Sequence, residues 1–231
     1  MVTAHLEAFF WILRTGDPWR EVPERFGKWQ TVYSQFRRWC RCGLWDALLR
    51  WFGTQARGVL RFVDGSYIKL HPHGLQGAAG LRPQEAIGLS RGGWTTKVVA
   101  VVYAAGLLCG ALLSPGNQHD QAASRALLPA LAGGHFVGDK GFDSEAFRTA
   151  LREAGVTEIT IPRRGYQTIA EQPAPFDAAV YRQRHKVENI FQRLKLHKRL
   201  ALRADKTASS YQGFLVFAAL LDRLLICEDT A

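Results

Sequence analysis

The stretch VLRFVDGSYIKL, residues 59–70, marks the point where the chain changes from helix-forming to strand-forming sequence. Its β-branched and aromatic residues alternate with other residues, which is the period-2 pattern of a β-strand. Asp64 stands inside this stretch, although aspartate is depleted in strands. The sequence therefore predicts a strand with an acid at a position that packing alone does not explain.

Further strands and helices are predicted downstream of this stretch. A Gly-rich loop covers residues 71–93, and residues 95–114 predict two buried strands joined by a turn. Short strands are then expected at 135–138 and 157–162, and helices at 119–133, 143–155, 178–200 and 210–226. Three consecutive strands followed by α/β alternation predict a mixed sheet flanked by helices.

Residues 1–56 predict a small helical N-terminal region, and residues 57–231 the main α/β domain. Two or three small helices carry arginines, among them Arg37 and Arg38, off their apolar faces. Such helices are compatible with a helix-turn-helix that reads DNA, and equally with a plain helical cap on the main domain. Both interpretations stay open at this point.

The composition excludes some classes of protein and favours others. The 231 residues are 47% hydrophobic, which excludes disorder by composition, and the net charge of +10 suits an anionic partner such as nucleic acid. The four cysteines lack a disulfide or zinc framework, so we expect reduced thiols. The longest apolar run, 98–113, is shorter than the roughly 20 residues that a spanning helix needs. We expect a cytoplasmic protein without a membrane partner.

Two further acids complete a set with Asp64. Asp139 follows a short apolar strand, and ligand sites in α/β sheets gather at the carboxyl ends of strands. Glu188 lies in YRQRHKVENIFQRLKLHKR, residues 181–199, beside the apolar face of the predicted helix. A salt bridge from Glu188 to Arg184, four residues earlier, is the simpler interpretation. A role as a metal ligand is the alternative.

The metal hypothesis rests on what three converging carboxylates require. Without a cation they would repel one another, and together they can hold two Mg²⁺ ions about 3.5–4 Å apart. Such ions activate a water or a 3′-hydroxyl for attack on a phosphodiester. Residues 182–206 contain nine Lys or Arg and two acids, so this segment could also position a phosphate backbone. We expect the three carboxyl groups within roughly 4–8 Å of one another.

The same segment resembles a known family. Tyr181, Arg184, Glu188 and Lys195 fit the Y-R-E-K signature of bacterial insertion-sequence DDE transposases. The surrounding motifs VDGSYIKLH, LSPGNQHDQ, VGDKGFDSEAFR and DKTASSYQGFLVFAALL are similar to the IS-five-type branch, and the resemblance covers essentially the whole chain. Relatives usually carry a further segment with DNA-binding helices before residues 9–16, FFWILRTG, so binding of transposon ends is implied less directly than the chemistry.

The resemblance implies a fold, a reaction and a set of residues. The fold is ribonuclease-H-like, and Asp64, Asp139 and Glu188 are the catalytic, metal-binding triad, with Mg²⁺ as the cofactor and Mn²⁺ as a substitute. The reaction is DNA cleavage and strand transfer at terminal inverted repeats, on double-stranded DNA, in a homo-oligomer that associates with the nucleoid. The expected DNA-binding residues are Tyr181, Arg184 and Lys195 by resemblance, and Arg91, Lys97, Arg37 and Arg38 from their charge and position.

Two other functions remain open from the sequence. A truncated or domesticated transposase would bind DNA without strand transfer, and a nuclease of the same fold would cleave DNA without joining it. His71 and His73 flank Pro72 and could bind a transition metal, although solvated loop histidines are the simpler interpretation.

Overall fold

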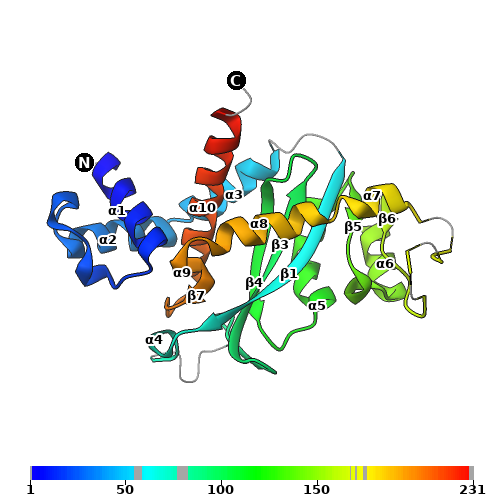
Figure 1. Cartoon of the computed structure of the whole chain (residues 1–231), viewed down its shortest axis with the longest axis horizontal. Helices are drawn as coiled ribbons and strands as arrows, with labels where there is room; N and C mark the ends of the chain where they lie inside the picture. The colour runs from blue at the N-terminus through cyan, green and yellow to red at the C-terminus, as the bar shows by residue number, and fades with distance from the viewer. Residues whose placement is uncertain are drawn as a thin grey trace.

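A mixed β-sheet forms the centre of the molecule, with helices against it and the N-terminal helices grouped beside one end (Figure 1). The computed structural model describes residues 2–54, 59–76, 83–166, 168–169, 171–173 and 176–228. The strands in these ranges are β1 (Leu60–Leu70), β2 (Gly88–Ser90), β3 (Gly93–Tyr103), β4 (Leu108–Pro115), β5 (His135–Val137), β6 (Glu158–Thr160) and β7 (Leu202–Arg203). The α-helices are α1 (Val2–Thr15), α2 (Trp29–Arg41), α3 (Leu44–Thr54), α4 (Pro72–Leu75), α5 (Asp120–Ser124), α6 (Glu145–Glu153), α7 (Ala178–Arg182), α8 (His185–Lys195), α9 (Lys198–Ala201) and α10 (Ala208–Glu228). The 3₁₀ helices are η1 (Trp19–Glu21), η2 (Glu24–Phe26), η3 (Arg125–Leu131) and η4 (Lys140–Phe142).

The strand pairing confirms the predicted mixed sheet. β3 pairs antiparallel with β1, β2 and β4, whereas β5 runs parallel to both β1 and β6. β7 adds a short parallel pairing to the far end of β1. Strands β2 and β7 were not predicted: β2 lies in the segment 71–93 that was expected to be a Gly-rich loop, and β7 has only two residues, too few to show a period.

Two hydrophobic cores lie on opposite faces of the sheet, because successive residues of a strand point to opposite sides. Along β1, Phe62 belongs to one core and Val63 to the other. The Phe62 core is covered by α8 and α10, and the Val63 core contains Phe147 of α6. The even-numbered residues of β1 near Phe62 therefore face helix α8, and Asp64 is one of them.

The N-terminal helices share the Phe62 core. Phe36 of α2 stacks on Phe214 of α10 with ring centroids 4.4 Å apart, and Phe9 of α1 meets Phe217 edge-on at 6.3 Å. As predicted, α1 stops before Gly16, which has a φ of +73° that favours glycine. The division at residues 56 and 57 stays a prediction, but the two parts bury their apolar side chains together.

Three predicted segments differ from the structure. The described part of the loop at 71–93 contains α4 and β2, and the predicted helix at 119–133 is α5 followed by η3, which contains Pro129. The predicted helix at 178–200 is broken into α7, α8 and α9. The first break is a tight turn, because the amides of Gln183 and Arg184 bond to carbonyls three residues earlier.

The cysteines that the structure describes are unpaired, and the apolar run 98–113 forms parts of the strands β3 and β4, as predicted. Cys40, Cys42 and Cys109 are free, and burial raises the pKa of the Cys109 thiol to about 11. The side chain of Cys227 lies outside the described part. Among the described helices, none is long and apolar enough to cross a membrane.

Acidification is expected to destabilise the fold through His135. Its Nε2 lies 2.7 Å from Oγ1 of Thr160 across the β5–β6 pair, and burial lowers the pKa of the imidazole. The unfolded chain therefore binds the proton more readily, and stability falls as the pH drops through the ordinary histidine pKa of about 6.5. Urea unfolding at several pH values should show this loss, and His135→Asn should reduce it. An equal loss in both proteins would contradict the assignment.

Candidate active site

Asp64 and Asp139 lie side by side because of the register between two parallel strands. Phe62 of β1 pairs with Val137 of β5, and each aspartate follows its paired residue by two positions. Neighbouring strands run about 4.8 Å apart, so the two acids sit at equivalent places beyond the pairing. Burial is the main cause of the raised pKa of Asp64, and the nearby charge of Asp139 raises it further. The sequence predicted both positions, and the structure brings the two residues together.

Helix α8 carries Glu188 to the same face. Its apolar side chains Val187, Ile190 and Leu194 are buried in the Phe62 core. Figure 1 shows α8 lying across the sheet from α7 at one end to α9 at the other. Glu188 is next to Val187 and stays exposed in the first turn, where a carboxylate also suits the helix dipole.

Arg184 links the strand acid to the helix acid. Its Nη1 lies 2.8 Å from Oδ2 of Asp64, and its Nη2 bonds to Oε1 of Glu188. The predicted salt bridge from Arg184 to Glu188 is therefore present, and the same guanidinium also reaches β1. Burial raises the pKa of Asp64, and Arg184 partly offsets this by favouring the ionised carboxylate. The guanidinium thus supplies the positive charge that the clustered acids require.

Tyr181 and Lys195 flank this group at the two ends of the signature. Tyr181, in α7, is half-buried near Arg184 and both aspartates, and burial raises the pKa of its phenol. Lys195 is exposed at the end of α8, where Nζ donates to Oγ of Ser66 at 2.7 Å. Three of the four signature residues thus lie on the α8 side of β1, where Arg184 bonds to Asp64 and Glu188 and Lys195 bonds to Ser66, and Tyr181 lies near the same acids.

The donor atoms suit a hard divalent cation, because carboxylate oxygens are the ligands that Mg²⁺ prefers. Within the described ranges, however, no three His, Cys, Asp or Glu side chains are grouped as a ready set of metal ligands. Arg184 contacts two of the three acids instead. The expected separation of 4–8 Å stays a prediction, and a metal bound by all three acids would require Arg184 to withdraw.

Asp120 is a fourth acid beside the site, in the first turn of α5. A Cβ added to Gly65 would lie 3.0 Å from its Oδ1, and one added to Gly141 would lie 3.6 Å from its Oδ2. Gly65 follows Asp64, and Gly141 donates its amide to Oδ1 of Asp139 at 2.8 Å. Asp120 thus fills the space between the two backbone segments that carry the aspartates. In the sequence, Gly65 and Gly141 were the feature that could have indicated a side chain packed closely against these two segments.

Lys97 was predicted to contact DNA, but the structure places it in the interior of the protein. Its side chain is 1% exposed, and Nζ lies 2.7 Å from Oδ1 of Asp120 and donates to the carbonyl of Gln118. The sequence suggested a phosphate contact because Lys97 follows a Gly-rich turn. Instead, strand β3 is buried, so the lysine is turned inward and neutralised by Asp120.

Substituting Asp120 by asparagine is expected to destabilise the protein by about 2–3 kcal/mol, because it leaves the buried Lys97 ammonium without its counter-charge. The double variant Lys97→Met/Asp120→Asn should recover part of this loss. Urea unfolding followed by circular dichroism measures both. If the single variant is as stable as the unmodified chain, the ion pair does not hold these segments in place.

The other predicted residues lie elsewhere. Arg91 is exposed in the turn between β2 and β3, and Arg38 is exposed on α2. Arg37 donates to Oγ1 of Thr207 at 2.8 Å, which ties α2 to the start of α10. His71 and His73 have ring centroids 4.6 Å apart, at the end of β1 and in α4. A DNA contact by the three arginines stays a prediction.

Comparison with known proteins agrees with this geometry. The family model "Transposase DDE domain" matches residues 55–221, and "Putative transposase of IS4/5 family" matches residues 3–49. A Brucella ovis protein named "Putative transposase for insertion sequence element IS6501" is 33% identical over 129 residues, covering 54% of this chain and 94% of that protein. "Uncharacterized protein y4sN" of Sinorhizobium fredii is 32% identical over 90 residues, covering 38% and 72%. No solved structure matches.

The sheet and its paired acids define a ribonuclease-H-like domain of the DDE class, and this class acts in DNA transposition. The chain belongs to the DDE transposase family, of the IS4/5 type. Membership implies dependence on a divalent metal and a DNA partner.

Proposed function

We propose that this protein cleaves DNA at the ends of an insertion sequence and joins the freed end to target DNA, using two Mg²⁺ ions. The observation that carries the proposal is the register of β1 and β5, which sets Asp64 beside Asp139, with Arg184 linking Asp64 to Glu188. The family match supports the same reaction class.

The reaction consists of two displacements at phosphorus. In the first, a water oxygen bonds to phosphorus, the P–O3′ bond breaks, and the 3′-oxygen takes up a proton. In the second, the new 3′-hydroxyl loses its proton, its oxygen bonds to a target phosphorus, the target P–O3′ bond breaks, and the leaving 3′-oxygen takes up a proton. Each step exchanges one P–O bond for another, so no energy source is needed.

The three acids and the basic residues have separate tasks in this proposal. Asp64, Asp139 and Glu188 would hold the divalent metal, which would supply activation of the attacking oxygen and stabilisation of the leaving oxygen. Arg184 neutralises the acids before metal arrives and then turns to a phosphate of the DNA. Tyr181 and Lys195 contact the backbone on either side. Lys195 is exposed for this task, and its bond to Ser66 sets its position.

The test is an assay on a labelled duplex that carries the element's end, with a second duplex as target. We expect Mg²⁺-dependent cleavage at the end and joined products of greater length, and Mn²⁺ in place of Mg²⁺ should support both. Hydrolysis without joining and without preference for the end would favour a nuclease. Binding without any cleavage in either metal would favour a DNA-binding protein.

A further inference from the structure

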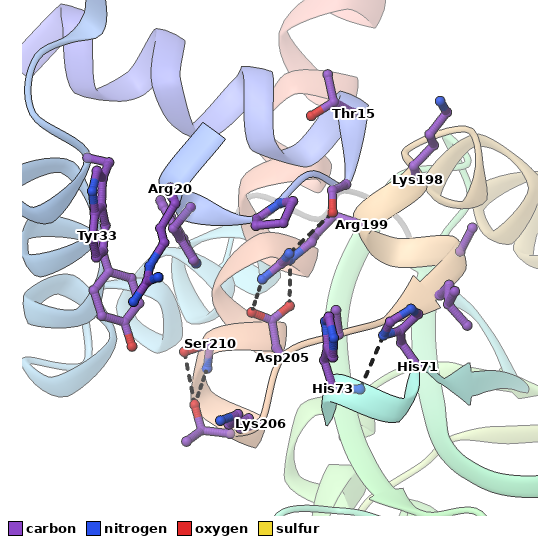
Figure 2. A pocket seen from close by; sticks show the side chains of 18 of the residues that line it. Thr15, Arg20, Tyr33, His71, His73, Lys198, Arg199, Asp205, Lys206 and Ser210 are labelled. Carbon is purple, nitrogen blue, oxygen red and sulfur yellow. Dashed lines mark hydrogen bonds and ion pairs between the residues drawn. The ribbon is translucent and has the colours of Figure 1, made fainter. Parts of the chain in front are cut away.

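A cleft of about 990 Å³ lies between the N-terminal helices and the segment from α9 to α10. Figure 2 shows Arg20 and Tyr33 on one side of it, His71 and His73 on the opposite side, and the paired Arg199 and Asp205 between them. The first two come from η1 and α2, and the histidines follow β1. The cleft therefore joins the N-terminal region to the end of the strand that carries Asp64.

The cleft carries an excess of positive charge. The described residues that line it include five Arg or Lys and one acid, Asp205. Arg199 and Asp205 neutralise each other, with Nη2 and Oδ1 2.7 Å apart. The remaining cations are Arg20, Arg37, Lys198 and Lys206, and none of them has an ion-pair partner within the described part of the chain. A polyanion is the ligand that such an arrangement favours.

Two of these cations are held in place by neutral partners. The Arg20 guanidinium stacks over the ring of Trp29 at 5.6 Å, and Arg37 donates to hydroxyls of Thr207 and Ser210 at 2.8 and 2.9 Å. These contacts order the side chains without cancelling their charge. Preorganised guanidinium groups bind phosphate with a smaller loss of conformational entropy.

The cleft is connected to the acids by β1 and by α8. From Asp64 to Leu70, β1 spans about 20 Å at about 3.3 Å per residue, and His71 follows at the cleft. On the helical side, Glu188 is followed by Lys195, which is bonded to Ser66, and then by Lys198 at the cleft. The basic side chains thus continue from the acids to the cleft.

We propose that this cleft binds the phosphate backbone of double-stranded DNA, roughly six nucleotides from the phosphate that lies at Asp64, taking 3.4 Å per nucleotide on one strand. This proposal rests on the proposed function for the position of the scissile phosphate. The cleft makes sequence-independent contacts and fixes the direction in which the duplex leaves the acids.

The test compares two double variants of the full chain. Lys198→Gln/Lys206→Gln removes two exposed cations of the cleft, and Arg50→Gln/Arg125→Gln removes two exposed cations outside it. Binding of a fluorescent duplex carrying the element's end is measured by anisotropy in EDTA, across a range of salt. We expect the cleft variant to bind about tenfold more weakly, with a log–log salt slope smaller by about 2, and the outside variant to change much less.

A second measurement locates the contact. Ethylation of DNA phosphates roughly six nucleotides from the cleavage point should interfere with binding of the unmodified chain, and should no longer matter for the cleft variant. Equal binding by the two double variants would overturn the proposal. The proposal would also be overturned if the cleft variant no longer bound inorganic phosphate or ATP but bound DNA unchanged. The cleft would then be a site for small anions.

These results are independent of the proposed reaction, because binding in EDTA does not require cleavage. If the unmodified chain cleaves and joins DNA but the cleft variant binds DNA normally, the proposed DNA contact at the cleft is refuted and the proposed reaction is not. If the unmodified chain never cleaves DNA but the cleft variant binds DNA more weakly, the proposed reaction is refuted and the proposed contact at the cleft is not.

Discussion

Replacing Asp64 or Asp139 by asparagine, or Glu188 by glutamine, is expected to lower the rate of DNA cleavage about 10³-fold or more. The amides keep the size of each side chain but remove the charge that holds a divalent cation. A loss of 10³ corresponds to about 4 kcal/mol of transition-state stabilisation. The rate of first-strand cleavage of a labelled end in Mg²⁺ is the measurement.

Glu153→Gln is the matched control, because Glu153 is exposed at the end of α6, away from these acids. It should cleave at the unmodified rate. Circular dichroism and DNA binding should show that all four variants are folded. Full cleavage by any one of the three site variants would remove that residue from the proposed triad.

The largest loss of stability is expected from Asp205→Ala, at about 3–5 kcal/mol. Asp205 and Arg199 form a two-pronged ion pair of 2.7 and 2.9 Å, and each residue is 5% exposed. Truncating the acid leaves the buried guanidinium of Arg199 without its counter-charge. Arg199 also lies over the ring of Phe214 and 3.4 Å from the carbonyls of Gly16 and Asp17, so its displacement would disturb α1 and α10 as well.

The double variant Arg199→Met/Asp205→Ala separates the charge effect from packing. Removing both charges should recover much of the lost stability, since a buried pair contributes little over apolar residues of similar size. Urea unfolding by circular dichroism measures both variants, with Glu153→Ala as an exposed control expected to stay within about 0.5 kcal/mol. If the double variant is less stable than Asp205→Ala, the stranded charge is not the cause.

The sequence was sufficient to predict five strands of the mixed sheet, β1, β3, β4, β5 and β6, and to select the three acids as candidates, whereas their convergence on a metal stays a prediction. Strand β1 and the β3–β4 hairpin have strong patterns, and Asp64 was visible because aspartate is unusual in such a strand. The charge of Lys97, by contrast, suggested the wrong surroundings. The residues VVAVVY that follow Lys97 are buried on both faces of the sheet, and Lys97 is buried with them. Its ammonium group can be buried there because Asp120 pairs with it.

The break between α7 and α8 was not visible from the sequence, because no proline or glycine marks it. Residues 181–187 have ordinary helix-forming character, and tertiary contacts decide the backbone there. The guanidinium of Arg184 reaches β1 from this turn, as well as bonding to Glu188. The cleft was likewise invisible, since its lining comes from segments more than 100 residues apart, such as Arg20 and Lys198.

The core shared by the first and last helices has a consequence for synthesis on the ribosome. Phe9 and Phe36 emerge early, but their partners Phe217 and Phe214 are made 208 and 178 residues later. Until α10 is available, the apolar faces of α1 and α2 have no complete partner and are exposed to chaperones and to other nascent chains. Assembly of the N-terminal region is therefore one of the last events in folding, and DNA contacts that span the cleft can form only on a finished chain.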